Sequence, residues 1–162
     1  MDFRFFLTTL LLSLVLLSAC NKDDDMSVVD DEQLEDGLID TLITAQGVQF
    51  VRTPEMYFQD LPDWSYAYQY VEIDGLRQAY VEAGPSDGAP VLLLHGQPSW
   101  SYLYRTMIPV LADAGYRVIA MDHLGMGRSD KPIDIAAYSY LGHADRLAQF
   151  IQQLGLQEIN LF

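Results

Sequence analysis

The sequence has a single cysteine and few basic residues. Its 162 residues include nine Lys or Arg and 23 Asp or Glu, for a formal net charge of −14. One cysteine excludes an intramolecular disulfide framework and a zinc site built from several thiolates. The scarcity of Lys and Arg argues against nucleic acid as a partner, because phosphate binding requires clustered basic side chains. Half of the residues are apolar, which excludes a wholly disordered chain.

The acidic residues are concentrated in one short segment. Residues 21–40 carry nine acids and one base, whereas residues 41–162 carry thirteen acids and seven bases. A run of like charges repels itself and stays solvated, so this segment is interpreted as a tether rather than a binding surface. The remainder is only mildly acidic, and its length suits one domain with a sizeable core.

The first twenty residues have the features of a targeting segment. The nearly unbroken apolar stretch from Phe5 to Ala19 is shorter than the roughly 20 residues that a transmembrane helix needs. It suits the apolar region of a secretory signal, and Arg4 precedes it. Its end, Leu17-Ser18-Ala19-Cys20, resembles a bacterial lipobox, in which cleavage before the cysteine is followed by acylation. The alternative is an ordinary signal peptide followed by a chance cysteine.

The lipobox resemblance implies an anchor in the lipid bilayer through acylated Cys20, since more than one hydrocarbon tail makes anchoring stable. The predicted organisation is a signal peptide at 1–19, a lipid-anchored acidic linker at 20–45 and a domain at 46–162. Asn21, rather than Asp, follows the cysteine, which in the resemblance favours the outer membrane. The predicted location is therefore the cell envelope.

Several β-rich runs follow this linker. Asp74-Gly75 separates the runs 68–73 and 76–82, and such a dipeptide strongly indicates a hairpin. The run 91–94 is apolar without alternation, which is typical of a parallel strand buried on both faces. Further strands are predicted at 116–121 and from residue 157.

Two helices are predicted between these strands. The first ends before Gly115 and contains Pro109, which predicts a kink or a late restart. Its expected apolar face consists of Leu103, Met107, Val110, Leu111 and Ala114. The expected apolar face of the second consists of Leu141, Ala144, Leu147, Ala148, Ile151 and Leu154. This order predicts an α/β fold with a mostly parallel sheet and helices on both faces.

The chain lacks the usual catalytic signatures. There is no Gly-x-Ser-x-Gly elbow, phosphate-binding loop or dinucleotide fingerprint. The histidines have no metal-ligand spacing, so no metal site is predicted. His95 closes a buried strand, and a loop-shaping role is favoured over proton transfer. Asp122 and His123 are adjacent at a strand end and should point in opposite directions, which argues against a dyad. Ser99 or Ser101 is expected to cap a helix.

The tripeptide Gly96-Gln97-Pro98 follows the strand at 91–94. Gly96 permits a sharp turn and Pro98 has no N–H, so the Gln97 N–H could point into a cleft at the carboxyl end of the strand. A backbone donor there would suit an oxyanion or a leaving anion. The alternative is a tight turn without a chemical role.

The segments 95–105 and 122–132, His-Gly-Gln-Pro-Ser-Trp-Ser-Tyr-Leu-Tyr-Arg and Asp-His-Leu-Gly-Met-Gly-Arg-Ser-Asp-Lys-Pro, resemble the haloalkane dehalogenases of the α/β-hydrolase superfamily. The resemblance covers residues 50–162. It implies that an aspartate displaces halide from a haloalkane and that a histidine then activates water to hydrolyse the alkyl ester, without cofactor or metal. It also implies that Gln97 binds an oxyanion or halide, in a loop shaped by His95, Gly96, Pro98 and Trp100. Gln replaces the expected Glu or Asn.

The same resemblance places the nucleophile, the acid and the base downstream of Phe162. The predicted fold is therefore the N-terminal part of an α/β-hydrolase, truncated at the start of the nucleophile strand and inactive by itself. Epoxide hydrolase or another α/β-hydrolase is an alternative, as is a non-catalytic lipoprotein fragment. Substrate identity, cap domain and oligomeric state are not predicted.

Overall fold

The computed structural model describes residues 39–162. The predicted signal peptide, Cys20 and most of the predicted linker lie outside these residues. None of the helices in the described part is long and apolar enough to cross a membrane.

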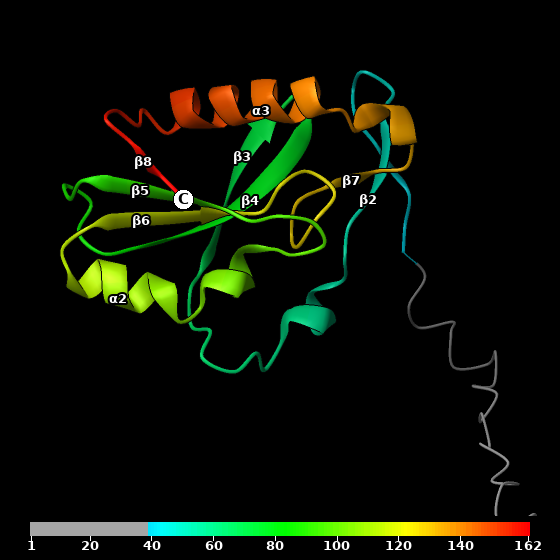
Figure 1. Cartoon of the computed structure of the whole chain (residues 1–162). Helices are drawn as coiled ribbons and strands as arrows, with labels where there is room; N and C mark the ends of the chain where they lie inside the picture. Colours follow the sequence, from blue (N-terminus) through cyan, green and yellow to red (C-terminus); the bar gives the residue numbers. More distant parts are fainter. Residues whose placement is uncertain (1–38) are drawn as a thin grey trace, which may run out of the picture. The chain divides into compact units, whose positions relative to one another are not determined.

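The centre of the fold is a five-stranded sheet lying between two helices (Figure 1). Its spatial order is β3 (Tyr68–Ile73), β4 (Leu76–Ala83), β6 (Arg117–Met121), β5 (Pro90–Leu94) and β8 (Asn160–Leu161). β5 is parallel to β6 and to β8, whereas β4 is antiparallel to β3 and to β6. The α/β fold is confirmed, and its described sheet is mixed because the hairpin contributes two antiparallel pairings.

The hairpin between β3 and β4 is confirmed at the predicted turn. Ile73 pairs with Leu76, so Asp74 and Gly75 are the two turn residues. Both have positive φ, 52° and 75°. Two consecutive positive φ values give a turn whose twist matches that of the strands, and Asp-Gly is the dipeptide that tolerates them best.

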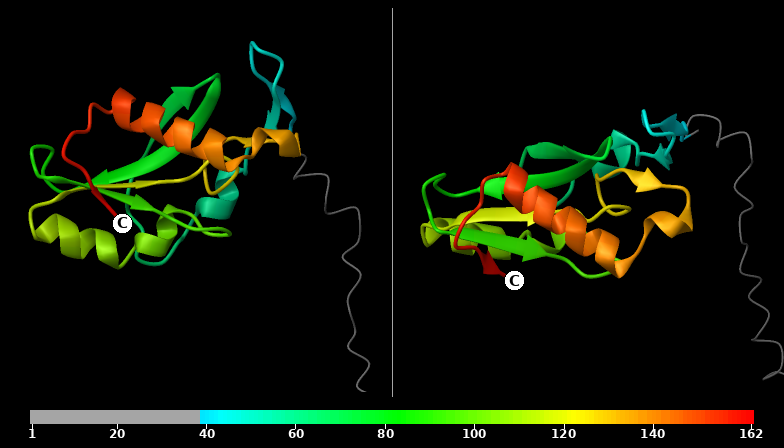
Figure 2. Two further views of the ribbon diagram at one scale, coloured as in Figure 1. Left: turned by 45° about the horizontal axis from the view of Figure 1, so that its top comes forward. Right: turned by 90° about the horizontal axis from the view of Figure 1, so that it is seen from above.

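The two central strands explain why residues 91–94 show no alternation. Successive side chains of a strand point to opposite faces, and here both faces are covered. Leu92, Ile119 and Met121 are buried on the α3 side, where Phe150 packs against them. Val91, Leu93 and Val118 are buried on the α2 side, with Tyr104 and Ile108. Figure 2 shows the two helices on opposite faces of the sheet.

The first predicted helix is divided in two. A short 3₁₀ turn (Ser101–Tyr104) precedes α2 (Met107–Asp113), so Pro109 lies in the first turn of α2 and the late restart is confirmed. The predicted apolar face was partly wrong, because Leu103 and Val110 are 50% and 68% exposed. The break between the two helical pieces shifts the phase of the repeat, and Tyr104 and Ile108 are buried instead.

The second predicted helix is α3 (Tyr140–Gln153), which Ser139 caps by accepting the Gly142 N–H. Leu147, Ile151 and Leu154 pack on the core as predicted, but Leu141 is 75% exposed, and Ala144 and Ala148 are also exposed. Arg146 belongs to the buried face instead. Its aliphatic stem is covered while Nη1 donates to the Ile73 carbonyl, and such partial burial is invisible to an apolar repeat.

A second, small sheet was not predicted. β2 (Gln49–Val51) lies between β1 (Leu42–Ile43) and β7 (Lys131–Pro132), with both pairings antiparallel. β1 thus lies inside the range assigned to the linker, and the loop assigned to 122–132 ends in a strand. A 3₁₀ turn (Glu55–Phe58) follows β2, and another (Ile135–Ala137) precedes α3. Strands of two or three residues are too short to leave a periodic pattern.

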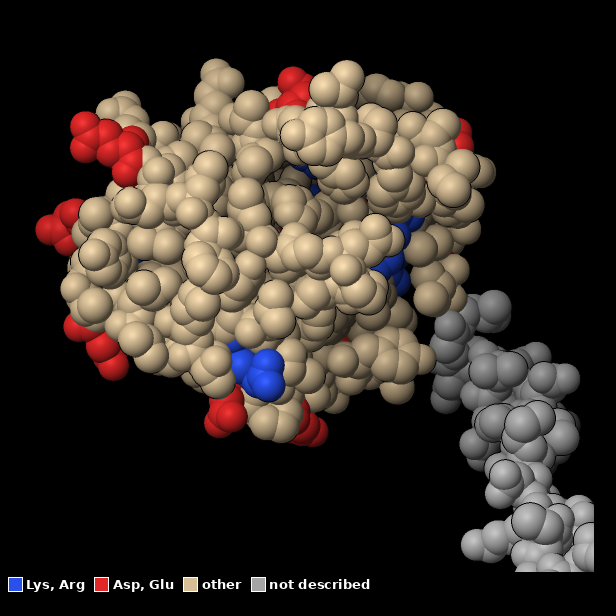
Figure 3. All heavy atoms as spheres, in the orientation of Figure 1, with Lys and Arg blue, Asp and Glu red and all other residues tan. Residues whose placement is uncertain are grey.

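The surface of the described part carries no large field of one sign on the face shown in Figure 3. Acidic side chains lie scattered around its periphery, and most of that face is uncharged. This agrees with the mild acidity of residues 41–162.

Candidate active site

Two loops meet at one edge of the five-stranded sheet. The segment 95–101 follows β5, and the segment 122–130 follows β6. Because β5 and β6 are parallel, their carboxyl ends lie at the same edge, where open α/β sheets bind their ligands. These two segments are called the rim loops below.

His95 connects the two rim loops. Its Nε2 accepts the His123 N–H at 2.9 Å, so Nδ1 carries the ring proton and donates to the Gly96 carbonyl at 3.0 Å. The side chain is buried, and desolvation lowers the pKa of His95 below its ordinary value. A neutral imidazole whose two nitrogens are both engaged shapes the loop and has no free position for proton transfer.

The three histidines lie in a row of edge-to-face contacts. The ring centroids of His95 and His123 are 4.7 Å apart, and those of His123 and His143 are 5.8 Å apart. Burial and the two neighbouring imidazoles lower the pKa of His123 to about 4. His143 is half-buried on α3. His123 faces these rings rather than Asp122, so the absence of an Asp–His dyad is confirmed for this pair.

Asp122 is fully buried and connects the rim loops a second time. Oδ1 accepts the Ser101 N–H at 2.7 Å, and Oδ2 accepts the Arg128 N–H at 2.9 Å. Desolvation raises the pKa of Asp122, and the hydrogen bonds oppose this shift. Neither predicted serine cap was correct: Trp100 occupies the N-cap of the 3₁₀ turn without a side-chain bond, and Asp122 satisfies the turn from across the sheet edge.

The glycine before Arg128 makes room for this carboxylate. A Cβ at Gly127 would lie 2.3 Å from Asp122 Oδ2 and 2.9 Å from the Trp100 Cβ, and the φ of Gly127 is +50°. Ser129 adds a further tie, since Oγ donates to the Asp122 carbonyl at 2.6 Å and accepts the Ala79 N–H at 2.9 Å. The spacing Asp-x-x-Gly-x-Gly-x-Ser therefore encodes one compact hydrogen-bonded loop.

A second buried aspartate in the same loop points to the scaffold instead. Asp130 accepts from Arg52 Nε at 2.7 Å and from the Arg77 N–H at 2.9 Å, and it is fully buried. The Arg77 side chain lies 3.2 Å away as a second ion-pair partner. Within the described residues, Asp130 thus joins the loop to β4 and to the residue that follows β2, and it makes no bond to the segment that carries Gln97.

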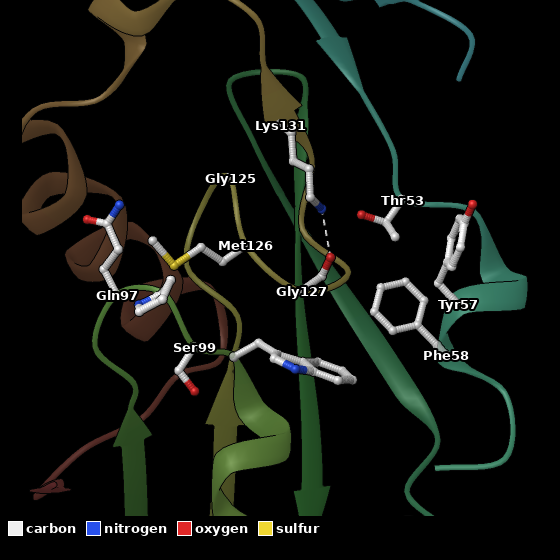
Figure 4. A pocket seen from close by; sticks show the side chains of 11 residues that line it. Thr53, Tyr57, Phe58, Gln97, Ser99, Gly125, Met126, Gly127 and Lys131 are labelled. Carbon is white, nitrogen blue, oxygen red and sulfur yellow. Dashed lines mark hydrogen bonds between the residues drawn. The ribbon is translucent and has the colours of Figure 1, made fainter. Parts of the chain in front are cut away.

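Gln97 is exposed and is one of the residues that line a cavity of about 470 Å³ (Figure 4). No group within residues 39–162 accepts a hydrogen bond from the backbone N–H of Gln97. Trp100 and Met126 line the cavity, and Lys131 Nζ donates to the Gly127 and Ser129 carbonyls beside it. The structure therefore brings the predicted loop residues His95, Gly96, Gln97, Pro98 and Trp100 together at the sheet edge, with a backbone donor left free.

The sequence patterns missed the opposite wall of this cavity. Thr53, Tyr57 and Phe58 come from the segment after β2. The Arg128 guanidinium lies 4.2 Å from the Phe58 ring and 4.3 Å from the Tyr68 ring, and it forms an ion pair with Glu55. This stacking between a cation and two aromatic faces holds the wall in place. No local signal connects residues 55–58 with residue 128.

Clusters of His, Cys, Asp or Glu that could hold a metal ion are absent from the described range 39–162. His95 could not serve as a ligand without losing one of its two hydrogen bonds. The Gln97 N–H, which no group in residues 39–162 accepts, is suited to binding an anion or a polarised oxygen.

Comparison with known proteins defines the class of the fold. Residues 89–162 match the sequence profile of the family described as alpha/beta hydrolase fold. This range contains β5, β6, β8, both helices and both rim loops. The described domain therefore has the alpha/beta hydrolase fold.

The sequence relatives are more specific. The chain is 50% identical over 117 residues to a haloalkane dehalogenase of Mycobacterium marinum, an alignment covering 69% of this chain and 39% of the relative. It is 47% identical over 120 residues to a haloalkane dehalogenase of Psychrobacter cryohalolentis. The chain is thus a homologue of haloalkane dehalogenases, and it spans about two fifths of the length of these relatives.

Solved structures of two kinds of hydrolase resemble the described domain. The haloalkane dehalogenase DpaA from Paraglaciecola agarilytica superposes with a TM-score of 0.67 at 46% identity, covering 70% of this chain and 40% of that chain. An epoxide hydrolase from Vigna radiata superposes with a TM-score of 0.55 at 31% identity, covering 59% and 30%.

Proposed function

We propose that this chain supplies the anion-binding half of a hydrolase that cleaves carbon–halogen bonds in small haloalkanes. The observation that carries the proposal is the Gln97 N–H, which no group in residues 39–162 accepts, at the carboxyl edge of the sheet in a chain that is 46–50% identical to haloalkane dehalogenases. A fixed backbone donor stabilises charge that develops during a reaction without having to reorganise.

The reaction converts an alkyl halide and water into an alcohol, a halide ion and a proton. A carboxylate first forms an ester to the carbon as the halide leaves, and water then hydrolyses that ester. Gln97 acts in both steps: its N–H stabilises the oxyanion of ester hydrolysis, and its side-chain amide can donate to the leaving halide. We expect the carboxylate nucleophile, the acid and the base in sequence that follows Phe162.

Halide release tests the proposal. The whole gene is sequenced beyond codon 162, and its product is incubated with short 1-bromoalkanes while bromide is measured. We expect bromide release that falls about 100-fold when the nucleophilic aspartate is replaced by alanine. Epoxide or ester turnover without bromide release would overturn the assignment.

Epoxide hydrolysis is the second candidate, because the Vigna radiata structure shares the fold at 31% identity. The two activities differ in how they treat the leaving atom: an epoxide oxygen must be protonated, whereas a halide needs only N–H donors. Assaying both substrate classes on the same preparation separates them.

We also propose that the protein is a lipoprotein of the cell envelope, anchored through Cys20. Support comes from the sequence alone: the apolar stretch, the lipobox-like end and a sole cysteine at that position. Two or more acyl chains suffice for stable anchoring.

Mass spectrometry of the membrane fraction tests the anchor. The native protein should begin at Cys20 with its mass increased by the acyl chains, and Cys20→Ala should prevent that modification. An unmodified N-terminus in the membrane fraction, or release of the wild type into the soluble fraction, would refute the anchor.

A further inference from the structure

Both ends of the loop that carries Gln97 are held by two consecutive residues. At one end, His95 Nε2 accepts the His123 N–H at 2.9 Å. At the other end, the Ser101 N–H donates to Asp122 Oδ1 at 2.7 Å. The five residues between His95 and Ser101 include Gln97, which itself makes no backbone hydrogen bond within the described residues.

The position of Gln97 therefore depends on where β6 ends. Within the segment, the Ser99 N–H donates to the Gly96 carbonyl at 2.9 Å, which makes the loop a compact turn. Asp122 in turn is fixed by its own backbone, whose N–H donates to the Ala79 carbonyl at 2.8 Å, and by the Arg128 N–H. A rigid strand end is thus connected to the free donor through a fully buried carboxylate.

We propose that Asp122 is a positioning residue that sets the orientation of the Gln97 N–H through the Ser101 amide. Asp122 does not touch the substrate in this arrangement. The proposal rests on the anion-binding role proposed for Gln97, but the mechanical coupling between Asp122 and the loop can be measured without any substrate. A misplacement of about 1 Å at a reacting centre can lower a rate 100-fold, so such a contact is functionally important.

Asp130 provides a matched control. It is as deeply buried as Asp122 and lies in the same rim loop, but its donors are Arg52, which follows β2, and Arg77 on β4. Asp122→Asn and Asp130→Asn each replace a buried carboxylate by an amide. Both variants lose a buried charge, but only Asp122 is bonded to the segment that carries Gln97. An effect on that segment that is seen in Asp122→Asn alone therefore comes from the lost bond to Ser101.

The test is hydrogen–deuterium exchange of the full chain, followed by mass spectrometry of peptides that cover residues 95–101. We expect Asp122→Asn to raise exchange in this segment at least tenfold, and Asp130→Asn to leave it within twofold of the wild type. Ser101→Pro removes the N–H donor, together with a hydroxyl that lies 3.4 Å from the Tyr68 hydroxyl, and suits the first position of a 3₁₀ turn. It should therefore act like Asp122→Asn even if that variant folds poorly. Unchanged exchange at 95–101 in both Asp122→Asn and Ser101→Pro would overturn the proposal, as would an equal rise in all three variants.

Activity of the whole protein provides the second readout. Asp122→Asn should lower kcat about tenfold or more with KM within twofold, whereas Asp130→Asn should leave both near wild type below its melting temperature. A parallel rise in KM without a change in kcat would contradict a role in transition-state geometry. If the unmutated protein releases no halide, the proposed function fails, and the exchange experiment still decides whether Asp122 positions the loop.

Discussion

The core and the rim of this domain are held together in different ways. The core consists of buried side chains such as Leu92 and Phe150 on the α3 side of the sheet and Leu93 and Ile108 on the α2 side. The rim loops instead depend on buried polar groups, of which Asp122, Ser129 and Asp130 are all fully buried. Apolar burial is tolerant of small shifts, whereas a buried carboxylate needs its donors at hydrogen-bond distance. The core thus supplies stability, and the rim supplies a defined geometry.

The largest effect should follow from emptying the core. Phe150 is fully buried and contacts Tyr80 edge-to-face, with ring centroids 5.4 Å apart. Phe150→Ala should lower the free energy of unfolding by about 3–5 kcal/mol. Val110→Ala on the exposed side of α2 is the control and should change it by less than about 0.5 kcal/mol. Urea unfolding followed by circular dichroism measures both, and equal losses would contradict the assigned burial.

A clash at the rim should rank second. Gly127→Ala places a Cβ against the Asp122 carboxylate, while Gly47→Ala has the same backbone restriction but open space around it. A positive φ costs an alanine about 1–2 kcal/mol, so Gly47→Ala should lose that amount. Gly127→Ala should lose at least about 2 kcal/mol more, because a buried polar network is disrupted. Equal losses in urea unfolding would show that the rim loop adapts freely.

The histidine row should make rim stability depend on pH. The folded-state pKa of His123 is about 4, below the ordinary value of 6.5, so the unfolded chain takes up the proton first. Stability should therefore be constant above pH 6.5 and should fall as the pH decreases towards 4. His95, whose pKa is also lowered, acts in the same direction.

His123→Phe keeps a ring in the row and removes its titration. The decrease in melting temperature between pH 7.5 and pH 5 should be smaller in this variant than in the wild type. Differential scanning calorimetry at both pH values provides the comparison. Identical decreases would exclude His123 as the group responsible.

The smallest effect should come from an ion pair at the sheet's other end. Arg117 Nε lies 2.6 Å from Glu82 Oε1, and both side chains are partly exposed. Glu82→Gln should lower the free energy of unfolding by no more than about 1 kcal/mol, and less at high salt. If Glu82→Gln lowered the free energy of unfolding as much as Gly127→Ala, polar contacts outside the rim loops would be equally important for stability.

Features that depend on neighbouring residues could be predicted from the sequence, whereas contacts between distant segments could not. The hairpin turn at Asp74-Gly75, the aliphatic strands and the late start of α2 follow from local pattern, because side-chain alternation and turn chemistry are local properties. The pairing of β2 with β7 was not predictable. The paired residues are about 80 positions apart in the sequence, and the two strands are only three and two residues long. Arg146 was overlooked because a repeat of apolar residues does not include a charged side chain, although the aliphatic stem of Arg146 is buried on the core-facing side of α3.

The candidate site shows the same contrast. Gly96 and Gln97 could be singled out because they follow a buried strand, and their place at the sheet edge agrees with that reasoning. The role of Asp122 could not be predicted, because its donors, Ser101 and Arg128, lie on two different loops. The cavity wall at Phe58 depends equally on a contact with Arg128, 70 positions further along the chain.

The strand order also sets the order of events during synthesis. β6 lies between β4 and β5, although both of these strands precede it in the chain. A nascent chain that has reached residue 110 thus holds the β3–β4 hairpin and β5 without the strand that lies between β4 and β5. β6 can pair with β4 and β5 only when residues 117–121 have left the ribosome. Asp122 and His123 follow directly and can then bond to the loop after β5. Translation pauses before that point would prolong the exposure of β4 and β5, and ribosome-bound chaperones are the natural protection for this interval.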